Sequence, residues 1–369
     1  MVKRLLFVNG IAILGVILFH SSGMGFVAML AWAGRYLPAG VSAADQVGSF
    51  SYYSLRAIEQ IVVFSIPAFL FVSGYFAAVS TGRKVNTSGW SMIFSRIKTL
   101  LIPYFIWSAV VIALNMVNGS DYSVPEILYK LLTGGANEIL YFVPLLVQFY
   151  LLSPFLVRLA RKNPLGLLIV TAVIQTLVQS LPYHVLFGAQ LAWVDSFYKL
   201  IPKWLFLSRI FWFPLGIVAG LYSEAFKRAI TRLRGWAIGA CVLLVPLGMI
   251  EWEALYRASG AIWLDHRETI TDNLYSIVVL IMLLTYVRLS PSTSEKINSL
   301  GLRSYGIFLT HGIFIEYTAK VIYHVAPALL GYQFILQPVF IFIGLAGPLV
   351  IMYLVDRSTM RKMYAYIYG

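Results

Sequence analysis

Charged residues are scarce in this chain. Only 12% of its 369 residues are Asp, Glu, Lys or Arg, whereas a soluble protein needs about 25% to cover its surface. In contrast, 60% of the residues are hydrophobic and the mean hydropathy is +0.80. This composition excludes a disordered chain and a coiled coil, and it indicates that most of the surface does not face water.

Cysteine is almost absent. The one cysteine, Cys241, lies in the apolar run 236–250, so no intrachain disulfide is possible and a disulfide-rich secreted module is excluded. Neither CxxC nor a Cys/His spacing typical of metal sites occurs. We therefore expect no bound metal, and we interpret Cys241 as a buried, inert thiol.

Acidic residues are few, and long hydrophobic runs are many. A hydrocarbon core of about 30 Å needs about 20 helical residues, and continuous apolar runs exclude the alternating pattern of a β-barrel. Ten candidate spans begin near Leu5, Ile58, Thr99, Ile139, Leu165, Leu205, Trp236, Asn273, Leu302 and Gln333. The sequence predicts an all-α polytopic membrane protein with about ten transmembrane helices in a single domain, residues 1–369.

The distribution of charge predicts the orientation. The chain has 28 Lys and Arg against 15 Asp and Glu, a net charge of +13. In a soluble chain this excess would suggest nucleic acid, but in a membrane protein it reports which loops face the cytoplasm. With both termini inside, 19 of the 28 basic residues fall on the inner side. We therefore predict cytoplasmic termini and no nucleic-acid partner.

Several ionisable residues fall at membrane depth. With a rise of about 1.5 Å per residue, His20 and Arg209 lie roughly 22 Å from the inner face and Glu316 roughly 20 Å. By the same count Glu59 lies one to two turns farther out, and His311 lies near the middle of the membrane. Because ionisable groups in a bilayer are costly, each is a candidate functional residue. Whether they converge depends on helix packing.

These residue types suit proton transfer. A neutral imidazole at His20 can remove a proton from a hydroxyl, and a carboxylate such as Glu59 or Glu316 would orient the ring. The guanidinium of Arg209 could hold an anion or stabilise an oxyanion. Each candidate also has a purely structural explanation, in which Arg209 extends towards the interface, Glu59 pairs with Arg56, Glu316 pairs with Lys320, and His311 is a hydrogen-bonded core histidine.

Five motifs occur in a fixed order along the chain. They are NGIAILGVILFH at 9–20, IPAFLFVSGY at 66–75, SRIKTLLIPY at 95–104, RIFWFPLG at 209–216 and LGLRSYGIFLTH at 300–311. In order and spacing this series resembles the acyltransferase-3 family of integral membrane O-acyltransferases, across essentially the whole chain.

The resemblance implies a function. Members transfer an acyl group, usually acetyl and sometimes succinyl, from cytoplasmic acyl-CoA to a hydroxyl of a glycan or lipid-linked sugar, in a bacterial inner membrane. It implies that His20 is catalytic and that Arg209 and the segment 73–75 are functional. The chain departs from the family at Asn9, where Arg or Lys is typical, and an amide cannot neutralise a phosphate.

We expect the donor at the inner face and the acceptor above it. Cations there suit the phosphates of coenzyme A, and its pantetheine arm could pass between the inner thirds of the first two spans towards His20. The predicted donor-binding residues are Asn9, Ser73, Tyr75, Arg83, Lys84, Arg96 and Lys98. His311 is a candidate substrate-binding residue.

Two other functions remain open. A polysaccharide or lipid-linked sugar transporter would share the polar midplane and would explain Asn9, although no internal repeat is visible. The second possibility is that the chain is an inactive or repurposed homologue of the family. Besides the acceptor and membrane lipids, candidate partners are a second copy of the chain and glycan-synthesis proteins. The aromatic segment Leu181–Ile210 could help to hold a bulky acceptor, or it could form an aromatic belt at the lipid headgroups.

Overall fold

The computed structural model describes residues 2–38, 40–82, 89–188, 191–260, 268–285 and 290–369. Within these ranges the chain forms helices and turns, with no β-strand. The α-helices are α1 Val2–Phe26, α2 Phe50–Val62, α3 Ser65–Gly82, α4 Gly89–Val117, α5 Val124–Thr133, α6 Phe142–Lys162, α7 Pro164–Ser180, α8 Ala192–Lys199, α9 Trp212–Leu221, α10 Ser223–Ser259, α11 Ile270–Thr285, α12 Pro291–Val325, α13 Gln333–Arg357 and α14 Tyr364–Tyr368. Short 3-10 or π-helical segments are η1 Val27–Ala31, η2 Ala33–Arg35, η3 Ala43–Gln46, η4 Leu181–Phe187, η5 Phe206–Arg209, η6 Pro327–Gly331 and η7 Thr359–Met363.

Many of these helices are long and apolar enough to cross a membrane. Seven such segments occur in the described ranges, namely Val2–Ala31, Phe50–Ser80, Trp90–Val117, Phe142–Lys162, Pro164–Phe187, Ser223–Ser259 and Gln333–Arg357. The helices α9 and α11 are apolar but shorter, with 10 and 16 residues. The ninth predicted span lies within α12. The all-α polytopic membrane fold predicted from the sequence is confirmed.

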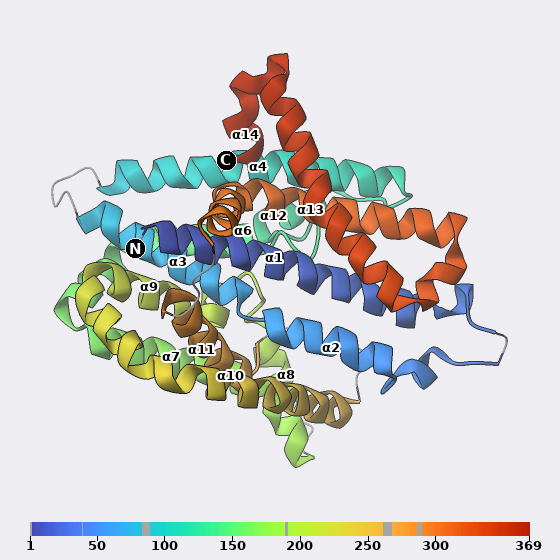
Figure 1. The fold of residues 1–369 in the computed structure, drawn as a ribbon, viewed down its shortest axis with the longest axis horizontal. Coiled ribbons are helices and arrows are strands. Elements are labelled where there is room, and N and C mark those ends of the chain that lie inside the picture. Colours follow the sequence, from blue (N-terminus) through green and yellow to red (C-terminus); the bar gives the residue numbers. More distant parts are fainter. Residues whose placement is uncertain (1, 39, 83–88, 189–190, 261–267, 286–289) are drawn as a thin grey trace.

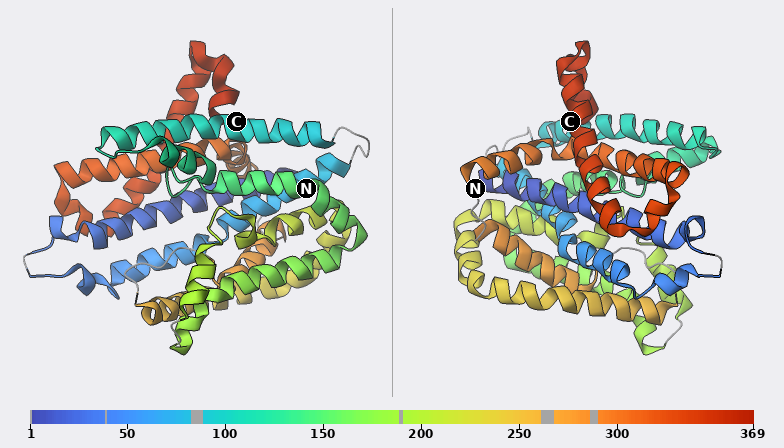
Figure 2. Two further views of the ribbon diagram at one scale, coloured as in Figure 1. Left: turned by 180° about the vertical axis from the view of Figure 1, so that it is seen from behind. Right: turned by 45° about the vertical axis from the view of Figure 1, so that its right-hand side comes forward.

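Two predicted spans are broken. The second divides into α2 and α3 around Val63, where Pro67 lacks the N–H that a continuous helix would use and the Ser65 hydroxyl donates to the Val62 carbonyl at 2.7 Å. The sixth, predicted to begin near Leu205, starts with the 3-10 segment η5 and becomes α-helical only at Trp212. Figures 1 and 2 show η4 and α8 projecting from the body near the end of α10. Both breaks leave polar groups in the interior.

The helix α1 occupies the middle of the molecule. Figure 1 shows α4 and α12 on one side of it and α7, α10 and α11 on the other, and Figure 2 shows the same order from two further directions. It packs directly against α2, α3, α12 and α13. On the outside, Trp236, Val242 and Ile250 of α10 are exposed, as lipid-facing side chains would be.

Both chain ends lie towards the same end of the helices. The Arg4 Nε donates to the carbonyl of Leu284 at the end of α11, at 3.2 Å. Gly369 lies beside Tyr305 and Thr99, in the first halves of α12 and α4. Figure 1 shows both termini in the left half of the molecule. This agrees with an even number of spans, and the assignment of that side to the cytoplasm stays a prediction.

Glycines bring helices unusually close at two interfaces. A Cβ atom at Gly74 of α3 would lie 2.0 Å from the carbonyl oxygen of Phe213 in α9, and one at Gly301 of α12 would lie 2.0 Å from that of Leu6 in α1. In a membrane, van der Waals packing of this kind is a main force between helices. These two contacts set where α9 and α12 stand relative to α1 and α3, and so they position the site.

Candidate active site

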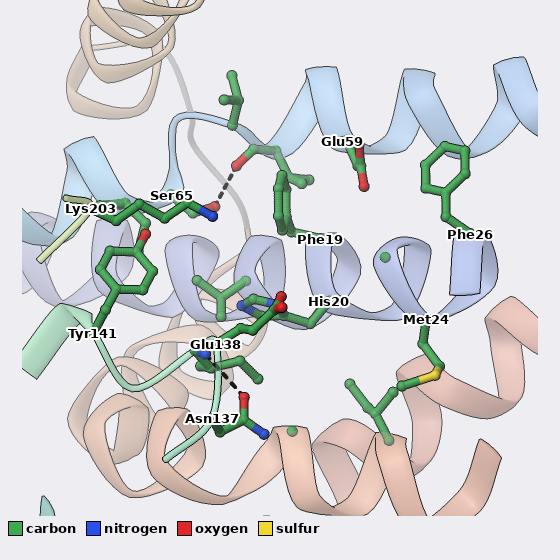
Figure 3. A pocket seen from close by; sticks show the side chains of 18 of the residues that line it. Phe19, His20, Met24, Phe26, Glu59, Ser65, Asn137, Glu138, Tyr141 and Lys203 are labelled. Carbon is green, nitrogen blue, oxygen red and sulfur yellow. Dashed lines mark hydrogen bonds between the residues drawn. The ribbon is translucent and has the colours of Figure 1, made fainter. Parts of the chain in front are cut away.

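A cavity of about 760 Å³ opens within the bundle. Residues of α1, α2, α3, α4, α10, α11 and α12 line it, together with η1, η5 and the connections that hold Ala136, Lys203 and Glu268. Figure 3 shows His20 and Glu59 on facing helices, with Tyr141, Asn137 and Glu138 entering from a loop. About half of the side chains that line this cavity are apolar, and the polar groups converge from segments far apart in the sequence.

The structure brings the four predicted catalytic residues together. His20, Glu59, Arg209 and Glu316 all line this one cavity. His20 is half-buried near the end of α1, and its ring centroid lies 5.3 Å from that of His311. The shared depth predicted from helical rise thus corresponds to a shared site, while the roles of these residues stay predictions.

Glu59 is engaged by a cation of its own helix. Its carboxylate pairs with Arg56, three residues earlier, and both side chains are buried. The Arg56 guanidinium also stacks on Trp252, with its carbon 3.4 Å from the ring centroid. Next to them, Gln60 donates to Asp272 at 2.8 Å. The pairing of Glu59 with Arg56, given above as the structural explanation for Glu59, is therefore present. If Glu59 orients His20, it does so as a carboxylate whose charge Arg56 already neutralises.

Arg209 is buried rather than extended towards the interface. Its Nε donates to Glu268 at 2.7 Å, and a terminal nitrogen donates to the Lys203 carbonyl at 3.3 Å. The ring of Tyr141 lies 5.3 Å from the guanidinium carbon. Both partners of the Arg209–Glu268 pair are less than a tenth exposed. A guanidinium held in this way presents a fixed positive edge to the cavity.

Glu316 is also paired. It accepts from Lys320, one turn later on α12, at 2.6 Å, and both side chains are about one-third exposed. The pairing inferred as an alternative from the sequence is present, and Glu316 nevertheless lines the cavity.

Sequence reasoning missed the loop that closes one wall of the cavity. Asn137 and Glu138 follow α5, which ends at Gly134 with φ of +79°. That conformation suits glycine and turns the chain sharply out of the helix. The side chain of Asn137 accepts from the Ile139 N–H at 3.0 Å, which orders the loop. Two polar residues one position after a glycine pair, between apolar helices, were the available signal.

His311 lies beside the cavity without lining it. It is fully buried, and its Nδ1 lies 2.8 Å from the Phe308 carbonyl and 3.1 Å from the Ile307 carbonyl. Its ring meets that of His20. The predicted role in substrate binding stays a prediction.

Three predicted donor residues, in α1 and α3, do not line the cavity. The amide oxygen of Asn9 is buried and has no hydrogen-bond partner among the described residues. Ser73 is half-buried, and Tyr75 is buried against α9 near Gly216 and Gly220. The motif around Gly74 thus forms a close helix contact.

The predicted inner-face cations are only partly described. Arg96 is half-buried, with its guanidinium carbon 5.8 Å from the ring centroid of Tyr150, and lines a small cavity of about 10 Å³. Lys98 is exposed. Arg83 and Lys84 lie outside the described residues. Among the described side chains, no three His, Cys, Asp or Glu residues lie together as metal ligands would.

The fold and the cavity define a polytopic helical membrane protein with a polar site around a histidine at membrane depth. The family model described as an acyltransferase domain matches residues 6–357. The chain therefore belongs to the acyltransferase-3 family and is an acyltransferase, which confirms the resemblance drawn from the five motifs. No curated protein and no solved structure matches the chain.

Proposed function

We propose that this enzyme moves an acyl group, with acetyl as the first candidate, from cytoplasmic acyl-CoA to a hydroxyl of a glycan or lipid-linked sugar. The observation that carries the proposal is the position of His20 on the wall of a cavity of about 760 Å³, inside a bundle of membrane helices. A histidine is the side chain best suited to take a proton from a hydroxyl near neutral pH.

The proposed chemistry uses few groups. The nitrogen of His20 that faces the cavity takes the proton of the acceptor hydroxyl, and the oxygen attacks the carbonyl carbon of the thioester. The carbon–sulfur bond then breaks, and the departing sulfur of coenzyme A receives the proton from His20. The fixed guanidinium of Arg209, held by Glu268, would stabilise the negative charge that develops on the carbonyl oxygen.

The polar groups of the cavity suit a sugar acceptor. Sites of about 300–1,000 Å³ hold drug-sized ligands, so this cavity offers room for at least one sugar ring. Two of its three cations are already neutralised, Arg56 by Glu59 and Arg209 by Glu268. Asn137 and Glu138 can form hydrogen bonds with hydroxyl groups. A polyhydroxylated acceptor fits this balance of charge better than one that places a phosphate in the cavity.

The donor would approach from the inner side. Arg96 and Lys98 near the start of α4 would contact the phosphates of coenzyme A, and the unsatisfied amide oxygen of Asn9 could accept from an amide N–H of its pantetheine arm. In this arrangement both termini lie in the cytoplasm, and the proposed location is a bacterial inner membrane. A second copy of the chain and proteins of glycan synthesis are candidate partners of the enzyme.

The test compares two identical substitutions. His20→Gln should abolish acyl transfer from radiolabelled acetyl-CoA by the purified protein in nanodiscs, and it should remove one acetyl mass from surface glycans of cells. His324→Gln, at an exposed site on the same protein, should retain both. Full acylation with His20→Gln would refute the proposed role. Glycan export that depends on the protein but not on acyl-CoA would favour the transporter instead.

A further inference from the structure

The hydrogen bonds of His311 determine its tautomer. Its Nδ1 lies 2.8 Å from the carbonyl oxygen of Phe308 and 3.1 Å from that of Ile307, both in the preceding turn of α12. Because a carbonyl oxygen only accepts, Nδ1 must carry the proton. In a neutral imidazole the other nitrogen, Nε2, is then an acceptor with a free lone pair.

This lone pair is buried. The Nε2 of His311 has no hydrogen-bond partner among the described residues, and the residue is 0% exposed. Buried polar atoms in native proteins nearly always have a partner, so an exception calls for an explanation. The ring packs beside that of Phe308, with the centroids 6.0 Å apart, and Phe308 in turn packs against Phe142.

The ring beside it is that of His20. The two ring centroids lie 5.3 Å apart, at an interplanar angle of 45°. Two imidazoles joined by an N–H···N hydrogen bond of about 2.9 Å have centroids roughly 5 Å apart. His20 is only half-buried and faces an open cavity, so a small rotation of its ring would bring one of its nitrogens onto the lone pair of His311.

We propose that His311 is a positioning residue for His20, whose ring N–H donates to the Nε2 of His311 both in the resting enzyme and during the reaction. This inference rests on the proposed function, in which His20 is the base. The hydrogen bond would hold one tautomer of His20, so that its other nitrogen meets the acceptor hydroxyl without a proton. When His20 has taken that proton, the neutral His311 continues to accept from the resulting imidazolium and stabilises it.

A neutral histidine suits this position better than a carboxylate does. The carboxylates of Glu59 and Glu316 already pair with Arg56 and Lys320, and a further negative charge between α1 and α12 would need its own counter-charge. His311 supplies an acceptor whose direction is set by its two bonds to the backbone. It does not itself exchange a proton in the reaction.

Two substitutions at His311 separate this role from packing. Gln places an uncharged acceptor oxygen near the position of Nε2, whereas Met fills a similar volume without a comparable acceptor. We expect His311→Met to lower kcat by about 10²-fold, with the KM for acetyl-CoA changed less than about threefold. His311→Gln should retain most of the wild-type kcat. Equal losses in both variants, or a loss confined to KM, would overturn the proposal.

A double mutant tests whether His311 acts through His20. The residual rate of His20→Ala should not fall further when His311→Met is added, since the group that His311 orients is already gone. Independent, multiplicative losses would refute the link. If His20→Ala itself keeps full activity, the proposed function fails instead, and this outcome is distinguishable from a failure at His311.

A third measurement does not depend on activity. The chain has five histidines, so ring-¹⁵N spectra of the protein in nanodiscs can be assigned by substitution. His20 should show one neutral tautomer in the wild type and in His311→Gln, and a mixture of tautomers in His311→Met. An unchanged His20 spectrum in His311→Met would overturn the proposal even if no acyl acceptor were known.

Discussion

Replacing Gly74 by Ala should force α3 and α9 apart. The added Cβ would lie 2.0 Å from the carbonyl oxygen of Phe213 and 2.9 Å from its carbonyl carbon. Ordinary contacts between such atoms need about 3.4 Å or more. The obstructing atoms belong to the backbone, so no change of rotamer can remove the clash, and the two helices must separate by about 1.4 Å along this contact.

The energetic cost follows from two opposing effects. Overpacking an interior contact costs about 1–3 kcal/mol, whereas Ala in place of Gly favours a helix by about 0.5–1 kcal/mol. Helix separation also weakens the van der Waals packing that holds membrane helices together. We therefore expect the free energy of unfolding to fall by about 1–2 kcal/mol. Acyl transfer should fall as well, because α9 begins three residues after Arg209.

Gly239→Ala is the matched control. Gly239 also lies within a long helix, α10, but a Cβ added there meets no atom within 4 Å. This variant should be as stable as the wild type or slightly more stable. Both variants can be unfolded in mixed micelles with increasing SDS, with circular dichroism as the signal. A midpoint for Gly74→Ala equal to that of Gly239→Ala would refute the argument from close approach.

Three further predictions concern charge and donor binding. Arg209→Met should destabilise the protein by about 3–5 kcal/mol, because it leaves Glu268 buried without its counter-charge; adding Glu268→Gln should recover part of the loss in the same SDS titration. The carboxylate of Glu126 accepts from the backbone N–H and hydroxyl of Ser123 at 2.7 and 2.8 Å, which lowers its pKa. The resulting stabilisation of α5 should be present at neutral pH and lost as the pH falls below about 4. Amide hydrogen exchange in α5 of the wild type should therefore lose protection on acidification, and this loss should be smaller in Glu126→Gln. Asn9→Leu should raise the KM for acetyl-CoA about tenfold with little change in kcat, as expected for one lost hydrogen bond of about 1.4 kcal/mol; an unchanged KM would place Asn9 outside the donor path.

The sequence predicted where membrane helices occur better than where they break. Continuous apolar runs indicate helices because lipid leaves no other way to satisfy backbone polar groups. Hydropathy carries no comparable signal for the interruption between α2 and α3, or for the short α9. Proline at positions 67 and 214 is compatible with a kink, a break or a helix start. Only the packing of neighbouring helices decides among them.

The depth of the site residues in the membrane could be predicted from the sequence, but their lateral positions could not. Helical rise placed His20, Arg209 and Glu316 at nearly one level, and the structure places all three around one cavity. The local pair of Glu59 with Arg56 followed from their i, i+3 spacing. Glu268 could not be identified as the partner of Arg209 because it precedes α11 in a connection, where no periodicity relates sequence to position.

The pairing of the buried charges bears on which group acts as the base. On α2 and α12, the carboxylates of Glu59 and Glu316 each hold a cation, and Asp272 accepts from Gln60 and from the Thr269 N–H. Protonating any of these would weaken an interaction that offsets the cost of burying the charge. A histidine is the side chain best suited to take up a proton near neutral pH, and His311 offers a neutral acceptor beside the ring of His20. The pairing of Glu59, Glu316 and Asp272 is thus compatible with the proposed role of His20 as the base.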